Sequence, residues 1–337
     1  MPRVDNMYIT DSELQTFLTD ETQAGKAKAL LAEQKTVWEL LRKGYESLDS
    51  VETRTFDFDG FQIKIQFNPG RIVSSSAKVD DKSIKERKCF LCPKNLPPEQ
   101  RGISAEGDYV ILCNPFPIFT EHFTIPNIEH TAQDIKSSFG KFLAFARDLG
   151  KFYTVFYNGP KCGASAPDHL HFQAGSKYFM PLDSEYDSIK TRLGNIIVDK
   201  ADLKVYAVDG YPGKFFSFES KNNSALEEAF DRFYDLLKEK SLSEEEPMMN
   251  LIGSYENDTW RVMVFPRAKH RPSYYFAEGD ENILLSPASV DMGGVLITPL
   301  EKDFKKITKE NILDIFNQVS YQAEDFALIK DKLAEKL

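Results

Sequence analysis

The stretch that decides the fold of this chain spans residues 157–173 and reads Tyr-Asn-Gly-Pro-Lys-Cys-Gly-Ala-Ser-Ala-Pro-Asp-His-Leu-His-Phe-Gln. A strand is predicted over Phe152–Tyr157, before the glycine-bearing loop, and a second from His169 to Gln173. Because side chains alternate along a strand, His169, His171 and Gln173 would share one face while the residues between them enter the core. Three polar groups on one face, preceded by a loop with glycine, serine and asparagine, indicate a pocket wall.

This arrangement suits phosphoryl-transfer chemistry. An uncharged imidazole is a nucleophile near neutral pH without a separate base. Ser165, the loop amides and the Gln173 amide can donate hydrogen bonds to phosphate oxygens as charge builds on them. The alternative is that the two histidines form a metal site or a hydrogen-bonded pair in the core.

A second constellation combines a Cys-x-x-Cys turn with two distant histidines, namely Cys89, Cys92, His130 and His169. Such a turn can hold one zinc ion with two thiolates, and two imidazoles would complete a closed tetrahedral site. A redox Cys-x-x-Cys is the first alternative, although no thioredoxin-like βαβ pattern surrounds it. A site that has lost its metal is the second.

With these motifs in view, the loop resembles that of the histidine-triad superfamily. The resemblance is to the branch with His-x-His-x-Gln, which contains galactose-1-phosphate uridylyltransferase and the diadenosine tetraphosphate phosphorylases. The segment His122-Phe-Thr-Ile-Pro-Asn-Ile-Glu-His130 is similar to the strand-turn-helix stretch of the same superfamily. The similarity is clear over residues 89–175.

The resemblance implies a nucleophile, His171, and phosphate ligands at Gln173, Asn158 and Ser165. It also implies a structural zinc on Cys89, Cys92, His130 and His169. The chain departs from the family pattern in two ways. It has His-Leu-His in place of the usual His-Pro-His, and one more residue than usual between Ser165 and His171.

Cations elsewhere are further candidates for phosphate contacts. An N-terminal arginine reaches the sugar-nucleotide phosphates in the uridylyltransferase, which implies this role for Arg71 and extends it to Lys78. Lys161 lies in the glycine-bearing loop, and the run from Arg267 to Arg271 is a local anion site in an acidic protein. For the arginine and for the basic run, the plain alternative is a solvated loop or turn.

Outside the loop, hydrophobic periodicity predicts a helix over residues 13–47, a hairpin from 53–58 and 61–67, and a helix at 131–149. Strands are predicted within 108–126, near 249–253 and 260–265, and around 294–298. Further helices are predicted at 224–239, 308–319 and 321–336.

A weak internal echo suggests a duplication. A β-rich run followed by Pro-x-x-x-His occurs at Pro126–His130 and again at Pro266–His270. We therefore predict an α+β chain of tandem histidine-triad-like units, with antiparallel sheets and helices packed on one face. The expected domains are an N-terminal helix and hairpin at 1–88, a catalytic unit at 89–200, and a degenerate second unit at 201–337 that lost its catalytic loop. In the second unit, Arg267 and Arg271 would face the first unit's pocket and bind a distal phosphate.

Composition limits the classes of protein. The 337 residues are 42% hydrophobic, which is ordinary for a globular protein, and the net charge of −10 argues against a protein that coats nucleic acid. No apolar run is long enough to span a membrane, and no secretory signal is visible, so we expect a cytoplasmic protein without a membrane partner. A homodimer is left open.

Together, these features predict a nucleotidyltransferase or phosphorylase that works through a nucleotidyl-histidine on His171. Its donor would be a nucleotide sugar or a dinucleoside polyphosphate, and its acceptor would bear a phosphate. Three alternatives stay open: a hydrolase that uses water as acceptor, a non-catalytic nucleotide-binding protein, and a zinc-stabilised scaffold. The intact His171 and Gln173 speak against the non-catalytic binder.

Overall fold

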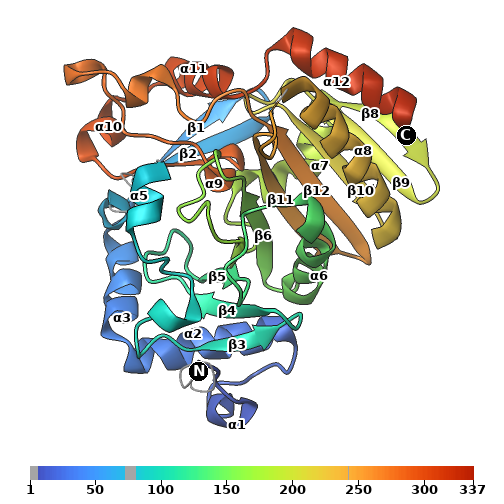
Figure 1. The fold of residues 1–337 in the computed structure, drawn as a ribbon. Helices are drawn as coiled ribbons and strands as arrows, with labels where there is room; N and C mark the ends of the chain where they lie inside the picture. The colour runs from blue at the N-terminus through green and yellow to red at the C-terminus, as the bar shows by residue number, and fades with distance from the viewer. Residues whose placement is uncertain (1–6, 73–80, 242) are drawn as a thin grey trace.

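The computed structural model describes residues 7–72, 81–241 and 243–337 and is built around one ten-stranded sheet (Figure 1). Every neighbouring pair of strands in this sheet is antiparallel. In their order across the sheet, the strands are β3 (Gly102–Ala105), β4 (Tyr109–Cys113), β5 (His122–Pro126), β7 (His171–Ser176), β6 (Tyr153–Asn158), β11 (Met249–Glu256), β12 (Thr259–Pro266), β10 (Phe215–Ser220), β9 (Leu203–Val208) and β8 (Gly194–Lys200).

The sheet consists of two topologically equivalent units that meet at the pair β6–β11. In each unit three strands precede a helix and two strands follow it. The helix is α6 (Phe139–Leu149) in the first unit and α8 (Asn223–Ser241) in the second. The predicted α+β class with tandem units is therefore confirmed.

The echo that suggested the duplication, however, equates strands that are not equivalent. By position in the sheet, β5 corresponds to β10, and β12 corresponds to β7. The boundaries predicted at 88/89 and 200/201 stay predictions. Because β8 pairs with β9, the strand order favours a start of the second unit at Gly194.

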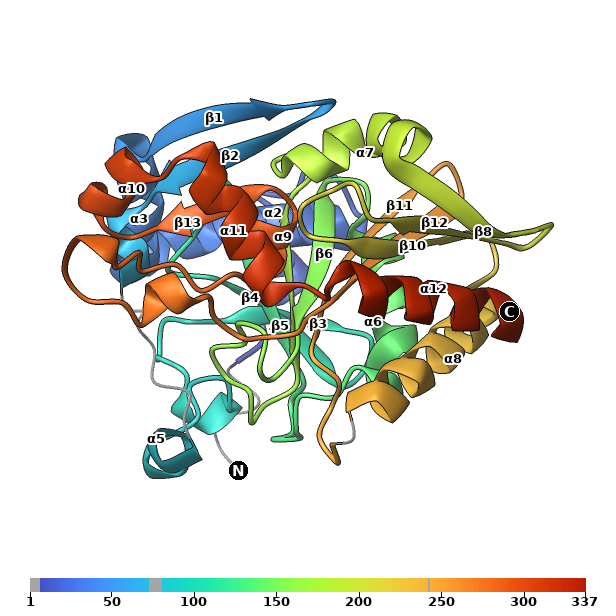
Figure 2. The same ribbon diagram turned by 90° about the horizontal axis from the view of Figure 1, so that it is seen from above.

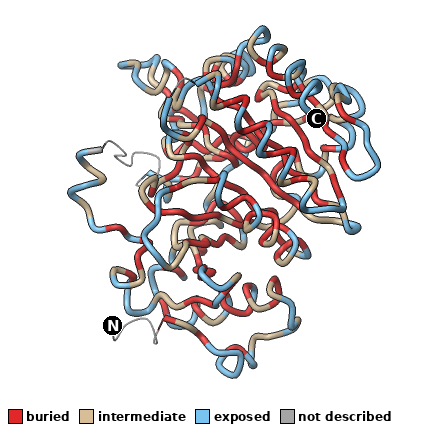
Figure 3. The backbone as a smooth tube through the Cα atoms, turned by 45° about the vertical axis from the view of Figure 1, so that its right-hand side comes forward, coloured by how far each residue is buried: buried red, intermediate tan, exposed pale blue. Residues whose placement is uncertain are grey.

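One face of the sheet is covered by a layer of helices. These are α6, α8, α2 (Gln23–Val37) and α12 (Ala323–Lys336), which enclose the larger hydrophobic core. In Figure 2, α8 and α12 lie on the opposite side of the sheet from α7 (Pro181–Leu193). The buried segments in Figure 3 follow the central strands, which places the core between sheet and helices.

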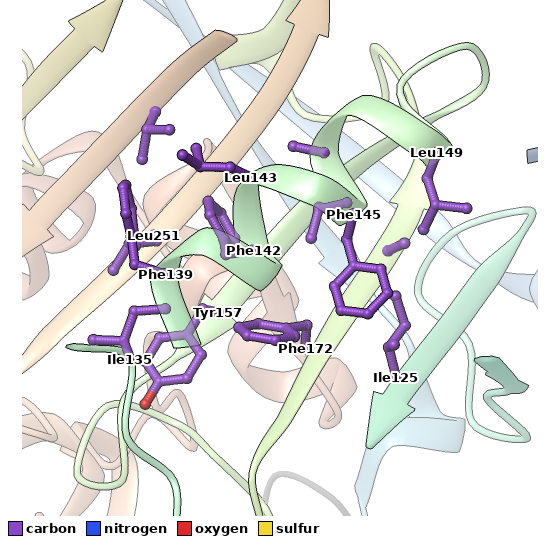
Figure 4. Close-up of a cluster of buried hydrophobic side chains, with 14 of the residues drawn as sticks. Ile125, Ile135, Phe139, Phe142, Leu143, Phe145, Leu149, Tyr157, Phe172 and Leu251 are labelled. Atoms are coloured by element: carbon purple, nitrogen blue, oxygen red, sulfur yellow. The ribbon is translucent and has the colours of Figure 1, made fainter. Parts of the chain in front are cut away.

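The strand β7 is anchored in this core through Phe172, which is fully buried. Its ring centroid lies 5.6 Å from that of Phe145 and 5.8 Å from that of Phe142, both on α6 (Figure 4). Rings at this separation pack favourably in tilted geometry. Since alternate side chains point to opposite faces, anchoring Phe172 directs His171 and Gln173 to the other face of the sheet.

That other face is covered by a second core, with a small sheet, α7 and further helices. The small sheet has the order β1-β2-β13, and β13 runs parallel to β2. It brings the N-terminal hairpin against the C-terminal part of the chain. The helices and strands not yet given bounds are β1 (Glu52–Phe58), β2 (Phe61–Phe67), β13 (Val295–Thr298), α1 (Asp11–Leu14), α3 (Glu39–Glu46), α5 (Asp81–Glu86), α9 (Ser289–Met292), α10 (Glu301–Lys306) and α11 (Lys309–Val319).

The single helix predicted over residues 13–47 is three helices: α1, α2 and α3. Thr22 starts α2 anew because its hydroxyl accepts a hydrogen bond from the Gly25 amide. Trp38 then has an extended backbone and separates α2 from α3. Within the described residues, no helix is both long and apolar enough to cross a membrane.

Candidate active site

His171 is the first residue of β7. It lies at the end of the β6–β7 pair where β6 finishes. The strand begins two residues later than predicted, because the His169 amide bonds the Ala166 carbonyl in a turn. The Nδ1 atom of His171 lies 2.8 Å from the carbonyl oxygen of His169. A carbonyl can only accept, so Nδ1 carries the proton and Nε2 keeps its lone pair. Burial lowers the pKa of His171 to about 4, so the ring is neutral at physiological pH.

His171 opens into a pocket of about 760 Å³. Its walls come from the N-terminal segment, the first unit and the C-terminal segment after β12. Trp38, Leu112, Pro115, Phe116 and Ile118 supply much of its apolar lining. The polar and charged lining residues used below are Arg71, Arg87, Asn158, Ser165, Gln173, Arg271 and Ser286.

Gln173, two residues along β7, is oriented by His122. The Ile118 amide donates to Nδ1 of His122 over 3.2 Å, so the proton of this ring is on Nε2. Nε2 donates to the Gln173 side-chain oxygen over 3.0 Å. Burial, with Arg71 close by, lowers the pKa of His122 to about 3 and keeps it neutral. The amino group of Gln173 is therefore left as the donor that can meet a phosphate oxygen.

Asn158 and Ser165, the phosphate ligands that the resemblance implies, both line the pocket. The side chain of Asn158 also bonds residues of the second unit. Its side-chain oxygen accepts from Nδ2 of Asn250 at 2.9 Å and from the amide and hydroxyl of Ser289, each at 2.8 Å. Gly163, at φ +95°, packs so tightly that an added Cβ would lie 2.5 Å from the Ala288 Cβ. The loop 159–170 is thus fixed against the C-terminal segment.

Two arginines present buried donors to the pocket. Arg71 donates to the Phe116 carbonyl over 2.7 Å, while its Nε has no hydrogen-bond partner among the described residues. Burial lowers the pKa of Arg71 to about 10, which still leaves it charged. Arg87 bonds Asp168 over 2.7 Å, and its other terminal nitrogen is buried without a partner within the described part of the chain. An unpaired buried donor is unfavourable, so both groups suit an anionic ligand.

Arg87 was missed by the sequence reasoning, which treated the stretch 74–88 only as polar. Its position two residues before Cys89 is the signal that could have found it. The pocket residues Ser286, Ala288, Val290 and Asp291 were also missed, because nothing in the sequence spacing links them to the loop 157–173.

Other candidates differ in where the structure places them. Arg271 lines the pocket; its Nε donates to Ser286 over 3.1 Å and it has no ion pair with a carboxylate among the described residues. Lys161 lies outside the lining, is exposed, and pairs with Glu245. Arg267 is 2% exposed and also lies outside the lining. Lys78 lies outside the described residues.

The guanidinium of Arg267 is a cross-link within the fold. It donates to Asn250 and to four backbone carbonyls, those of Val319, Pro287, Lys269 and His270. Every donor direction is used inside the protein, so the predicted phosphate contact for Arg267 is not supported by its geometry. The reason is that Arg267 lies between two other segments: its amide bonds the Met248 carbonyl, and it forms a β-bridge with Ser320.

The four residues of the predicted metal site come together. The ligand atoms of Cys89, Cys92, His130 and His169 all lie within 4.8 Å of one another. The sulfur of Cys89 lies 3.3 Å from Nδ1 of His169, and the sulfur of Cys92 lies 3.2 Å from Nδ1 of His130. These separations suit donors around one tetrahedral ion, and two thiolates with two imidazoles are a set that zinc prefers.

The surroundings of this cluster also fit a metal. Nε2 of His169 lies 2.7 Å from the Asn127 carbonyl, so it carries the proton and leaves Nδ1 free to act as ligand. Nε2 of His130 lies 3.6 Å from Asp168, whose carboxylate also binds Arg87. The Arg87–Asp168 pair therefore connects the metal cluster with the pocket.

Three solved structures of the yeast Ap4A phosphorylase Apa2 are similar to this chain. The first has a TM-score of 0.51 and 15% identity, covering 85% of this chain and 94% of that chain. The complex with AMP has a TM-score of 0.52 and 16% identity, covering 85% and 97%. The complex with Ap4A has a TM-score of 0.52 and 16% identity, covering 86% and 97%. The chain therefore shares its fold with this Ap4A phosphorylase.

Two family models divide the chain between them. A domain of unknown function (DUF4922) matches residues 30–176, and the GDPGP1-like C-terminal domain matches residues 188–337. Among curated proteins, none matches the sequence.

Proposed function

We propose that this chain is a nucleotidyltransferase or phosphorylase that carries a nucleoside monophosphate on Nε2 of His171. The observation that carries the proposal is the 2.8 Å contact between Nδ1 and the His169 carbonyl, which makes Nε2 of a neutral, pocket-facing ring the free nucleophile. A histidine in a non-catalytic binding pocket has no need of this fixed tautomer.

The reaction would have two steps. First, Nε2 attacks the α-phosphorus of the donor, an N–P bond forms, and the bond to the leaving phosphate oxygen breaks with its electron pair going to that oxygen. The His169 carbonyl holds the Nδ1 proton as the ring becomes positive. Then an oxygen of the acceptor phosphate attacks the same phosphorus, and the N–P electron pair returns to Nε2.

Charge on the non-bridging oxygens would be met by fixed donors. We assign this role to the amino group of Gln173, which is oriented by His122, and to the guanidinium of Arg71, both of which line the pocket. Arg87 and Ser165 also line the pocket, and a terminal nitrogen of Arg87 lies 3.4 Å from the Ser165 carbonyl oxygen. Donors that are already oriented need no reorganisation in the transition state, which is the main source of such stabilisation.

The substrate class proposed is a nucleotide sugar or a dinucleoside polyphosphate, with a phosphate-bearing acceptor. The similarity in fold to a yeast Ap4A phosphorylase supports it, as does Arg271 on the wall formed by the second unit. We assign Arg271 to a distal phosphate, because its guanidinium is stacked 4.1 Å over the Tyr275 ring and carries no carboxylate partner among the described residues.

Zinc is the proposed resident metal, held by Cys89, Cys92, His130 and His169. Its contribution is structural: four protein ligands close the site, and binding adds directly to folding free energy. By fixing His169, it would hold the carbonyl that orients His171.

The test is intact-mass spectrometry after incubation with UDP-sugars, GDP-sugars and diadenosine polyphosphates in turn. We expect a mass gain of one nucleotide with one donor class, and no gain for His171→Ala at an unchanged melting temperature. Analysis of the released product then separates a phosphate acceptor from water, and so a transferase from a hydrolase. Labelling of His171→Ala at the wild-type rate would overturn the proposal.

A further inference from the structure

Gln133 is a buried side chain beside the catalytic strand that the reaction scheme has not used. It is 3% exposed and does not line the pocket. Its side-chain oxygen accepts from the His171 amide over 2.8 Å. Its amino group donates to the His171 carbonyl over 3.1 Å and to the Asn158 carbonyl over 2.9 Å. All its hydrogen bonds therefore go to the main chain of two pocket residues.

The position of Gln133 explains how the two strands separate at the active site. The pairing of β6 with β7 ends at Phe156↔Gln173, and its continuation would place Asn158 opposite His171. In an antiparallel pair those two residues would exchange both backbone hydrogen bonds. The carboxamide of Gln133 takes that place, since it offers His171 one acceptor and one donor as a peptide group would.

The segment that carries Gln133 is itself held by hydrogen bonds on both sides of this residue. The Leu170 amide donates to the Thr131 carbonyl over 2.7 Å. The Ile135 amide donates to the Glu246 carboxylate over 2.7 Å, and the Tyr157 hydroxyl donates to the same carboxylate over 3.0 Å. Gln133 is thus held between the catalytic loop and a residue of the second unit.

We propose that Gln133 is a positioning residue for His171. By bonding both backbone groups of His171, it sets the torsion of the strand at that residue and so the direction of Nε2. It acts through His171 and touches no substrate. The consequence for rate rests on the proposed function, whereas the consequence for the imidazole does not. Small errors in the placement of a reacting atom lower rates by about 100-fold.

The experiment compares Gln133→Met with Gln34→Met in the metal-loaded full chain. Gln34 is a fully buried glutamine on α2 whose side-chain oxygen accepts from the Arg101 amide over 3.0 Å, outside the pocket lining. It therefore matches Gln133 in residue type, burial and loss of a backbone anchor. Gln133→Glu is the second variant, because it keeps the shape and one acceptor if the methionine variant fails to fold.

Two readouts are needed. The first is the tautomer of His171 from ¹⁵N nuclear magnetic resonance of histidine-labelled protein, with the signal assigned by His171→Ala. The second is the single-turnover rate of adduct formation, beside the dissociation constant of the nucleotide.

In the wild type and in Gln34→Met, we expect His171 to be fully in the Nδ1–H form with the same adduct rate. In Gln133→Met we expect a mixture of tautomers, and an adduct rate lower by roughly 10- to 100-fold with nucleotide affinity changed little. A wild-type tautomer together with a wild-type rate in the Gln133 variants would overturn the proposal. So would an equal loss of rate in Gln34→Met. If the wild type forms no adduct with any donor, the proposed function fails, and the tautomer comparison still decides the role of Gln133.

Discussion

The two units of the sheet join their last two strands in different ways: the first by a long loop that lines the pocket, the second by a tight turn. In the first unit, residues 159–170 connect β6 to β7 and contain Gly163, Ser165 and His169. In the second unit only Asn257 and Asp258 connect β11 to β12, with φ of +50° and +58°. Two consecutive residues with positive φ are typical of a tight hairpin turn. The same strand pair therefore exists with a long loop that lines the pocket and with a two-residue turn.

The side chains near the start of β7 and near the start of β12 also differ in whether they face a pocket. The first unit presents a neutral histidine to an open pocket. In the second unit, the Arg261 guanidinium lies 3.7 Å over the Tyr186 ring of α7, and Lys190 pairs with Glu219 at 2.9 Å. Nε of Arg261 forms no hydrogen bond among the described residues, but it lies 3.8 Å from the Glu219 carboxylate, so the positive charge at this end already has a counter-charge. A shared sheet therefore does not imply a shared site.

The second unit nevertheless contributes from its opposite end. Asn250 at the start of β11 fixes Asn158, and Arg271 after β12 lines the pocket. Because β6 and β11 are antiparallel neighbours, the start of one strand lies beside the end of the other. Both units thus line the pocket, although only the first supplies the histidine that we propose as the nucleophile.

The largest expected effect comes from the metal cluster, for which the second unit has no counterpart among the described residues. We expect one zinc per chain by elemental analysis. Cys89→Ser should lose it and lower the melting temperature by roughly 10 °C or more, since structural zinc contributes several kcal/mol to folding. Cys113→Ser, a buried cysteine outside the cluster, is the control that keeps the metal. Freshly purified wild-type protein without any metal would contradict this prediction.

The paired charges of the second unit should matter for stability and not for chemistry. Arg261→Met removes the contact with the Tyr186 ring and leaves Glu219 with Lys190 as its partner. We expect the free energy of unfolding to fall by roughly 1–3 kcal/mol, in denaturant titrations, with an unchanged adduct rate. A large loss of adduct rate at full occupancy would mean that this end of the sheet takes part in catalysis.

Arg271 and Arg267 should separate binding from folding. Arg271→Ala should raise KM roughly tenfold with kcat nearly unchanged, because a remote phosphate contact exists in both the ground state and the transition state. Arg267→Ala should instead lower the melting temperature, because it leaves buried carbonyl oxygens without donors. Steady-state kinetics and thermal melts on both variants check this. Wild-type KM for Arg271→Ala at low salt would show that the residue is only part of a solvated turn.

The smallest effect concerns Glu246, through which the second unit supports Gln133. Burial raises the pKa of this carboxyl to about 8, with Asp134 raising it further and Ile135, Tyr157 and Lys238 opposing. The folded state then holds the proton more tightly than the unfolded state. Stability should therefore fall as pH rises from about 4.5 to about 8, and stay level above that.

Glu246→Gln stays neutral and should remove this dependence. Its melting temperature should approach the wild-type value at pH 5 and exceed it by a few degrees at pH 9. Parallel melting curves of the two proteins across this range would contradict the raised pKa.

The sequence predicted features whose signals are local. The hairpin around Asp59-Gly60, the strands near 249–253 and 260–265 and the Cys-x-x-Cys set all occur as expected, because alternation and ligand spacing are short-range patterns. The contacts of Asn158 with Asn250 and Ser289 could not be predicted, since they depend on how two distant segments pack. Gln133 had no signal at all: a glutamine before a helix acquires its role only from a gap in a strand pair.

The central claim is that the nucleotide is carried by His171 and by no other residue. Its most direct measurement is tandem mass spectrometry of proteolytic peptides after the wild-type protein has been incubated with the donor that labels it and quenched at a pH that preserves phosphoramidates. We predict one nucleotidyl group, on the peptide that contains residues 169–173 and assigned by fragmentation to His171. A nucleotide on another residue, or turnover without any adduct at full donor occupancy, would contradict the account.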